Sequence, residues 1–426
     1  MHFHFSFYSS FLLLFFLQAL LFAALLLRKG KAEGQPAYYW LAAFLVAGCL
    51  YIAPWMLGHA GWYSQQPYRD LLFYLPLQHR FLIGPLLYGY TRCLLNPEAA
   101  FRRRDLLHFL PAALYIGYSC VMFVTDKLVL GRPWFYADGH DRDLDTWYAV
   151  AGMVSMGGYL WAAYRYYRVY RRLLLESVSD AGNAVFSWIR KYLLAFGAVQ
   201  AIGLAVFLIW PGWGGFTFKW WSFLAFAVLL YYIGLNALMS RERTVLRFAA
   251  EGEGYRVVPL HGNGTEEPGF LLPATDPEPE PPDPELLAWK GRLLDLMVSA
   301  APYRDPELNL GALARLLGTN TATLSRTINR GFGVNFNDFV NHYRVRAVLE
   351  ALAAGEQEQQ TLLGIAFDSG FNSKNTFNRA FRKHTGHAPS EYNAVRPGSM
   401  RVLSLEKVGS DHKSGRPEGS GGAILP

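Results

Sequence analysis

The first 240 residues carry long, nearly unbroken runs of apolar residues that short polar stretches separate. A run of about 20 apolar residues can cross the hydrocarbon core of a bilayer as one α-helix. We count seven such runs, at residues 5–27, 37–57, 71–95, 106–125, 144–164, 186–210 and 216–239. The third is the least regular, because Pro76, Pro85 and several polar residues interrupt it. The pattern predicts a bundle of seven transmembrane helices over residues 1–247.

The hydrophobic pattern changes near the other end of the chain, where residues 362–392 follow a helical period. Leu363, Ala366 and Phe367 form one apolar stripe, and Gly370 ends that helix. Either Asn372 or Ser373 can cap a second helix. The inward face of this second helix consists of Phe377, Ala380, Phe381 and His384. Its opposite face is polar and contains no acid, and it consists of Asn375, Asn378, Arg379 and Arg382.

Two short helices that meet at a glycine turn are typical of a helix-turn-helix, whose second helix enters the major groove of DNA. Arg can bond guanine and Asn can bond adenine in a bidentate way, while Lys374 and Lys383 can meet phosphate. The alternative is an ordinary amphipathic helix with a solvated polar face. Periodicity alone does not separate the two interpretations.

The residues themselves resemble a known family. The run from Ile365 to Tyr392 resembles the second helix-turn-helix unit of the arabinose-regulator (AraC/XylS) family of bacterial transcription factors. The resemblance rests on a G-F pair, an F-x-R-x-F core and a closing T-G-x-x-P-x-x-Y, which are Gly370, Phe371, Phe377, Arg379, Phe381, Thr385, Gly386, Pro389 and Tyr392. The match extends over about a quarter of the chain. It implies a homeodomain-like domain with two helix-turn-helix units.

A second unit of the same layout lies upstream, at residues 310–332. Its second helix has Leu324, Ile328 and Phe332 on the inward face. Residues 335–352 read as one connecting helix, which would hold the two reading helices in successive major grooves about 34 Å apart. The predicted DNA-binding residues are Ala322, Ser325, Arg326, Asn329, Arg330, Ser373, Lys374, Asn375, Asn378, Arg379, Arg382 and Lys383.

Basic residues indicate how the chain is oriented in the membrane. Sixteen Lys and Arg lie in or beside alternate loops and after the last run, and only five lie on the other side. Because basic loops stay in the cytoplasm, the N-terminus is predicted to be outside and the C-terminal domain inside. The first run has no basic residue before it and three directly after it, the reverse of a signal peptide, so we interpret it as a retained span.

Composition agrees with this division. Hydrophobic residues make up 52% of the chain and charged residues only 17%, with a net charge of +7. Residues 248–283 are rich in proline and acid and are predicted to be a semi-extended linker. Residues 284–394 form the predicted DNA-binding domain, and residues 395–426 a disordered tail. The predicted fold is all-α.

No sequence motif indicates catalysis, since H-E-x-x-H, G-x-S-x-G and P-loop patterns do not occur. We therefore expect neither an enzyme nor a cofactor or metal site. The candidate signal site is His79 with Arg80, because a cation inside a bilayer usually faces a polar cavity. The alternative is that the span begins late and Arg80 extends to the outer interface.

The sequence thus predicts a multi-pass protein of the bacterial cytoplasmic membrane that regulates transcription. The expected partners are double-stranded promoter DNA, the lipid bilayer and a small-molecule or envelope signal. The limited operator surface that one such domain buries favours a homodimer. Two alternatives stay open for the membrane part, namely a transporter with a regulatory domain and a passive anchor.

Overall fold

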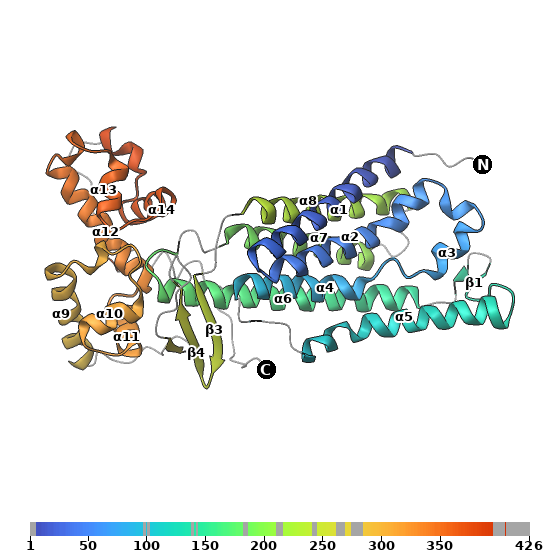
Figure 1. Cartoon of the computed structure of the whole chain (residues 1–426), viewed down its shortest axis with the longest axis horizontal. Coiled ribbons are helices and arrows are strands. Elements are labelled where there is room, and N and C mark those ends of the chain that lie inside the picture. Colours follow the sequence, from blue (N-terminus) through green and yellow to red (C-terminus); the bar gives the residue numbers. More distant parts are fainter. Residues whose placement is uncertain are drawn as a thin grey trace. The chain divides into compact units, whose positions relative to one another are not determined.

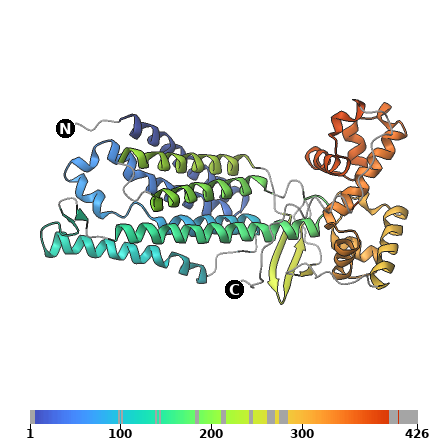
Figure 2. The same cartoon turned by 180° about the vertical axis from the view of Figure 1, so that it is seen from behind.

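The computed structural model describes residues 6–96, 99, 103–137, 140–141, 144–181, 186–209, 216–240, 245–260, 269–273, 284–394 and 405. The chain forms two compact units. The first is Met1–Arg168 with Phe186–Arg241, and the second is Val169–Val185 with Glu242–Pro426. Figures 1 and 2 show the elements of both units from opposite sides.

The first unit consists mainly of long apolar helices, which are α1 (Phe7–Glu33), α2 (Ala37–His59), α4 (Arg80–Leu95), α5 (Leu110–Phe123), α6 (Asp145–Ser177), α7 (Ser187–Ile209) and α8 (Phe216–Met239). Among the described residues, four helical stretches are long and apolar enough to cross a membrane: Phe7–Glu33, Ala37–His59, Arg103–Val129 and Trp220–Met239. The predicted spans at residues 144–164 and 186–210 stay predictions. The last residues of α6, from Val169 on, belong to the second unit.

The third predicted span is not one helix, and that expectation was wrong. The chain forms a short α3 (Tyr68–Tyr74), leaves helical geometry at Leu75 and starts again with α4 at Arg80. Pro76 explains the break, because it lacks an N–H donor and favours an extended conformation in the residue before it. Shorter elements complete this unit: η1 (Trp62–Ser64), η2 (Arg103–Phe109), η3 (Val124–Val129), β1 (Tyr136–Ala137) and β2 (His140–Asp141).

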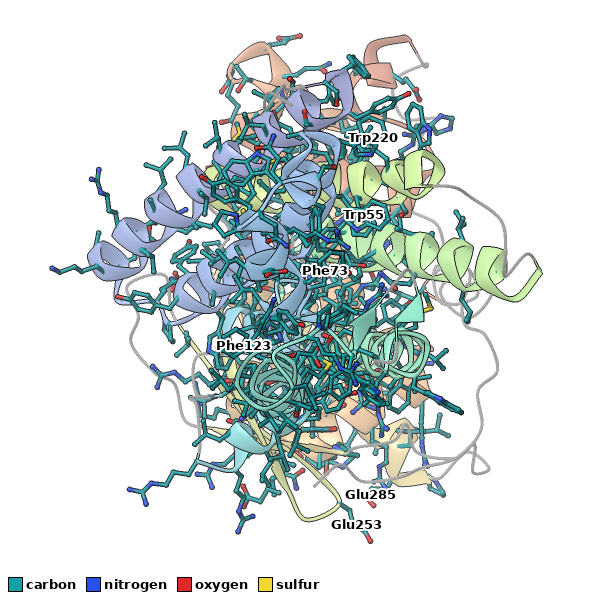
Figure 3. All side chains as sticks on the ribbon, turned by 90° about the vertical axis from the view of Figure 1, so that its right-hand side faces the viewer. Trp55, Phe73, Phe123, Trp220, Glu253 and Glu285 are labelled. Atoms are coloured by element: carbon teal, nitrogen blue, oxygen red, sulfur yellow. The ribbon has the colours of Figure 1, made fainter. Side chains whose placement is uncertain are left out.

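Helices α1, α2 and α8 pack side by side. Gly48 of α2 allows the close approach of Leu230 in α8, as small residues do between membrane helices. Trp55 of α2, which is labelled in Figure 3, stacks on Phe223 of α8 with ring centroids 4.5 Å apart. At the C-terminal end of α1, the Lys29 ammonium donates to the last carbonyls of α8. Helices α1 and α8 therefore end on the same side of the bundle.

The second unit contains an antiparallel sheet in the order β3 (Leu246–Glu251), β4 (Gly254–Pro259), β5 (Phe270–Pro273). The predictions of an all-α fold and of a linker over residues 248–283 were wrong for these strands. The turn between β3 and β4 has Gly252 in the left-handed region, followed by Glu253 (Figure 3), which is a hairpin signal. The buried face of this sheet consists of Leu246, Phe248, Val257, Phe270 and Leu272. The rest of the predicted linker and nearly all of the tail lie outside the described residues.

The remainder of the second unit is helical: α9 (Pro284–Ser299), η5 (Pro302–Arg304), α10 (Leu310–Leu317), α11 (Thr321–Gly331), α12 (Phe336–Ala353), η6 (Glu356–Glu358), α13 (Leu362–Asp368), α14 (Lys374–Thr385) and η7 (Pro389–Ala394). Helix α12 runs between two helical groups, one with α9, α10 and α11 and one with α13 and α14 (Figure 1).

Candidate nucleic-acid interface

The turn between α13 and α14 is built by local residues. Gly370 has a φ of +96°, and a side chain there would meet the Tyr303 carbonyl, so only glycine fits. Ser373 caps α14, and its hydroxyl oxygen accepts the Thr376 N–H at 3.2 Å. Gly386 ends α14 in the left-handed conformation. These residues set the start, the end and the entry angle of α14.

The inward face of α14 is confirmed, because Phe377, Ala380, Phe381 and His384 are all buried. They pack with residues of α12 and α13 in one core, which contains Val345, Val348, Leu352, Ile365, Ala366, Phe371, Phe377, Ala380 and Phe381. Phe367 differs from the expectation, since it is 46% exposed and Ile365 takes the inward position. The core therefore fixes which side of α14 faces solvent.

Most predicted DNA-binding residues of α14 lie on its outward face. The exposed ones are Lys374, Asn375, Asn378, Arg379 and Arg382, while Ser373 and Lys383 are half-buried. Lys383 donates to the Asp338 carboxylate of α12 at 2.7 Å, so in this conformation it has a partner within the domain. Its phosphate contact stays a prediction.

The first helix-turn-helix unit has the same layout as the second. Asn320 caps α11, and Leu324, Ile328 and Phe332 are buried as expected. The predicted DNA-binding residues of α11 differ more from one another in solvent exposure. Ala322 is exposed, and Arg326, Asn329 and Arg330 are half-buried. Ser325 is buried, with 8% of its surface exposed. Strand β5 packs against α11, and Glu285 of α9 lies 3.8 Å from Arg326.

Helix α12 carries buried polar residues that the sequence reasoning missed. Asn337, Asn341 and Arg344 are all buried, and their spacing of four and three residues places them on one face. This polar stripe at helical spacing was the available signal. The Arg344 guanidinium donates to the carbonyls of Tyr303 and Asp305, each at 2.7 Å.

Burial lowers the pKa of the Arg344 guanidinium to about 10, so it stays charged at neutral pH. A buried charge needs partners, because an unpaired one is costly to desolvate. The ring of Phe371 also lies 5.8 Å from this guanidinium. Arg344 thus contacts residues before α10 and the start of the α13–α14 turn, and it ties the two helix-turn-helix units together.

Two histidines lie beside each other in the domain, His342 on α12 and His384 on α14, with ring centroids 5.7 Å apart. Burial lowers the pKa of each to about 4. Both are therefore neutral at physiological pH. Neither ring nitrogen of His384 has a hydrogen-bond partner among the described protein atoms.

The candidate signal residues lie in the first unit at the break before α4. His79 is buried, and its ring meets Tyr115 edge-on at 6.2 Å. The Arg80 N–H donates to the Tyr148 hydroxyl at 3.0 Å, and its guanidinium lies over the Tyr51 ring. This aromatic enclosure surrounds both residues, and their role in sensing stays a prediction.

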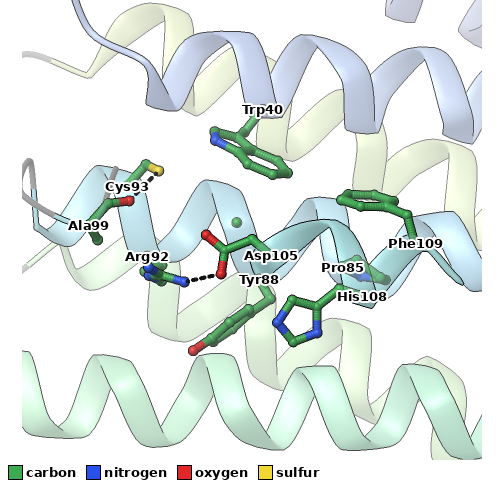
Figure 4. A pocket seen from close by; sticks show the side chains of 10 residues that line it. Trp40, Pro85, Tyr88, Arg92, Cys93, Ala99, Asp105, His108 and Phe109 are labelled. Carbon is green, nitrogen blue, oxygen red and sulfur yellow. Dashed lines mark hydrogen bonds and ion pairs between the residues drawn. The ribbon is translucent and has the colours of Figure 1, made fainter. Parts of the chain in front are cut away.

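A cavity also lies near the end of α4 (Figure 4). Trp40, Tyr88 and His108 line it together with an ion pair between Arg92 and Asp105 at 3.1 Å. Its volume is about 20 Å³, which has room for about one water molecule. It is therefore too small for an organic ligand in this conformation.

The two helix-turn-helix units and their acid-free second helices define a DNA-binding domain of transcription regulators. Residues 313–394 match the family described as a helix-turn-helix domain. The relatives that match this region have the names of transcription regulators, and neither name is that of an enzyme.

Two relatives show how far the similarity extends. An uncharacterized HTH-type transcriptional regulator of Staphylococcus aureus strain COL is 30% identical over 91 residues, which is 21% of this chain and 12% of that protein. The probable transcription factor PqrA of Proteus vulgaris is 28% identical over 105 residues, which is 24% of this chain and 84% of PqrA. No solved structure matches the chain.

Proposed function

We propose that this chain is a membrane-bound one-component transcription regulator of the AraC/XylS type. Its C-terminal domain binds promoter DNA through α11 and α14, and its membrane domain receives an external or lipid-borne signal. The observation that carries the DNA-binding proposal is the outward face of α14, where five Asn, Arg and Lys side chains are exposed and no acid occurs. Such a face supplies both base contacts and phosphate contacts.

The packing of α1 against α8 supports the proposed orientation. The basic residues at the C-terminal end of α1 include Lys29, which donates to the carbonyls of Ala237 and Leu238 near the end of α8. The chain continues from the end of α8 to the DNA-binding domain, so the proposal assigns the end of α8 and these basic residues to one side of the membrane. Basic loops are retained in the cytoplasm, where the chromosome is.

Genome-wide mapping of DNA occupancy by the full chain, compared with expression changes after its deletion, tests this function. We expect discrete occupied promoters whose genes change expression when the protein is removed. Absence of any specific occupancy contradicts the proposal. A fusion reporter after Tyr392 that is active only outside the cell contradicts the orientation. Ligand flux in proteoliposomes would favour a transporter, and full regulation by residues 284–394 alone would favour a passive anchor.

A further inference from the structure

Residues 177–180, which are the last residue of α6 and the three that follow it, lie against the DNA-binding domain and are buried or half-buried. Ser177 and Ser179 have no exposed surface, although a polar loop between two helices normally lies in solvent. The Ser179 N–H donates to the Leu308 carbonyl at 3.1 Å, and Val178 pairs with Asn309 as an antiparallel bridge. The loop therefore joins the start of the first helix-turn-helix unit by backbone bonds.

The same loop satisfies the buried polar stripe of α12. The Asn337 amide donates to the Ser179 carbonyl at 2.7 Å. The Arg344 guanidinium donates to the Ser179 hydroxyl at 2.9 Å. Asn337 and Arg344 thus have hydrogen-bond partners in this loop. Without the loop, the domain would expose these two polar side chains or leave them partly unsatisfied. Since buried polar groups need partners, this surface of α12 is adapted to receive the loop.

The loop also reaches the second reading helix. Asp180 accepts a hydrogen bond from the Thr376 hydroxyl at 2.7 Å, in the first turn of α14. The N-terminal residues of a recognition helix approach the base edges and the DNA backbone. A carboxylate at this position adds negative charge where phosphate must come near.

The end of α6 and the side of α14 line one cavity. A cavity of about 150 Å³ has Arg171 and Leu175 of α6 on one side and Arg379 and Lys383 of α14 on another. The major groove is about 12 Å wide, and a helix with its side chains fills nearly all of that width. A second helix beside α14 would therefore collide with the phosphate backbone that forms the wall of the groove.

We propose that residues 177–180, with the end of α6, form an intramolecular latch that keeps the DNA-binding domain off DNA until the latch is released. This inference rests on the proposed DNA-binding function. Because the latch continues directly from α6, a shift of that helix would open or close it. The latch segment contacts Leu308, Asn337, Arg344 and Thr376, so one short loop holds α12 and both helix-turn-helix units.

A substitution in the full chain tests the latch. Asp180→Ala removes the bond to Thr376, and Glu253→Ala is the matched control, because Glu253 is an exposed acid in the β3–β4 turn. Binding to a labelled random-sequence duplex at low salt is measured with protein in lipid nanodiscs. We expect Asp180→Ala to bind about tenfold more tightly than the control, since a hydrogen bond to a charged group is lost only from the latched state. Equal binding by both variants contradicts the latch.

A reversible cross-link gives the sharper test. Asp180→Cys and Thr376→Cys are combined in a chain whose three natural cysteines are replaced by alanine, with each single variant as a control. Oxidation should join the two positions and lower the affinity for the duplex about tenfold or more, and reduction should restore it. A cross-linked protein that binds as well as the reduced one overturns the latch, as does failure of the cross-link to form.

The two proposals fail in different ways. If the reduced and oxidised proteins both bind duplex well, the latch is wrong and the DNA-binding function stands. If neither form, nor the Asp180→Ala variant, binds any duplex at low salt, the proposed DNA-binding function itself is wrong.

Discussion

The two helix-turn-helix units share one layout but differ in what surrounds their reading helices. Helix α14 exposes Asn375, Asn378, Arg379 and Arg382 along one face. In α11, Ser325 is buried, Arg326 faces Glu285 and β5 packs against the helix. The same sequence pattern therefore leaves the polar side chains of α14 exposed, although the latch flanks this helix, and partly covers those of α11. A polar stripe at helical spacing predicts the direction of a face, but neighbouring segments decide whether it is accessible.

Loss of Arg344 should have the largest effect on the stability of the DNA-binding domain, because Arg344 joins the two helix-turn-helix units. In Arg344→Leu the carbonyls of Tyr303 and Asp305 lose their buried donor, and we expect the domain to lose about 3–5 kcal/mol of stability. Hydrogen exchange of α13 and α14 in the full chain measures this loss. Arg346→Leu is the control, since its exposed pair with Glu350 should contribute under about 1 kcal/mol. Similar losses in both variants would argue against a joining role.

The contribution of base contacts to specificity should differ between the two helix-turn-helix units. Arg379→Ala should change the preference at one base position by about 1–3 kcal/mol, the value of a bidentate contact. Arg326→Ala should have a smaller effect, because Arg326 must first leave Glu285. Affinities for a panel of operator variants measure both. A uniform loss across the panel would remove the base-reading assignment of the residue concerned.

Acid should lower the stability of the second helix-turn-helix unit more than that of the first. The folded-state pKa of buried His384 is about 4, below its usual 6.5, so the unfolded chain binds its proton first. Its stabilising contribution is complete above pH 6.5 and falls by about 1.4 kcal/mol per pH unit as the pH drops toward 4. Hydrogen exchange of α14 between pH 6.5 and 5 measures this, with His384→Leu expected to flatten the dependence. The control Asn378→Ala, at an exposed residue of α14 without a titratable group, should leave the slope unchanged.

The smallest effect concerns phosphate contacts. Lys374 is exposed, and its replacement by alanine should lower the salt slope of DNA binding by about one. Lys383→Ala should lower the slope by about one only if Lys383 leaves Asp338 when DNA binds. Titration of binding against salt concentration separates the two cases. An unchanged slope for Lys383→Ala would mean that the pair with Asp338 persists on DNA.

Local signals determined much of the DNA-binding domain from sequence alone. The caps Asn320 and Ser373, the turn residue Gly370 and the apolar period of α14 act within a few residues, so each helix could be located without knowledge of the fold. The break in the third span was also signalled locally, by Pro76. The hairpin turn at Gly252 was present in the sequence too, but the proline-rich and acidic composition of residues 248–283 favoured a linker.

Only the tertiary structure decided which polar residues are buried and what covers them. The bond between Ser179 and Arg344 joins residues 165 positions apart, and the bond between Asp180 and Thr376 joins residues 196 positions apart. No periodicity within a helix reports such a contact, because its partner lies on a distant segment of the chain. The sequence determined the helices of the DNA-binding domain and their faces, while long-range packing decided which of those faces are open.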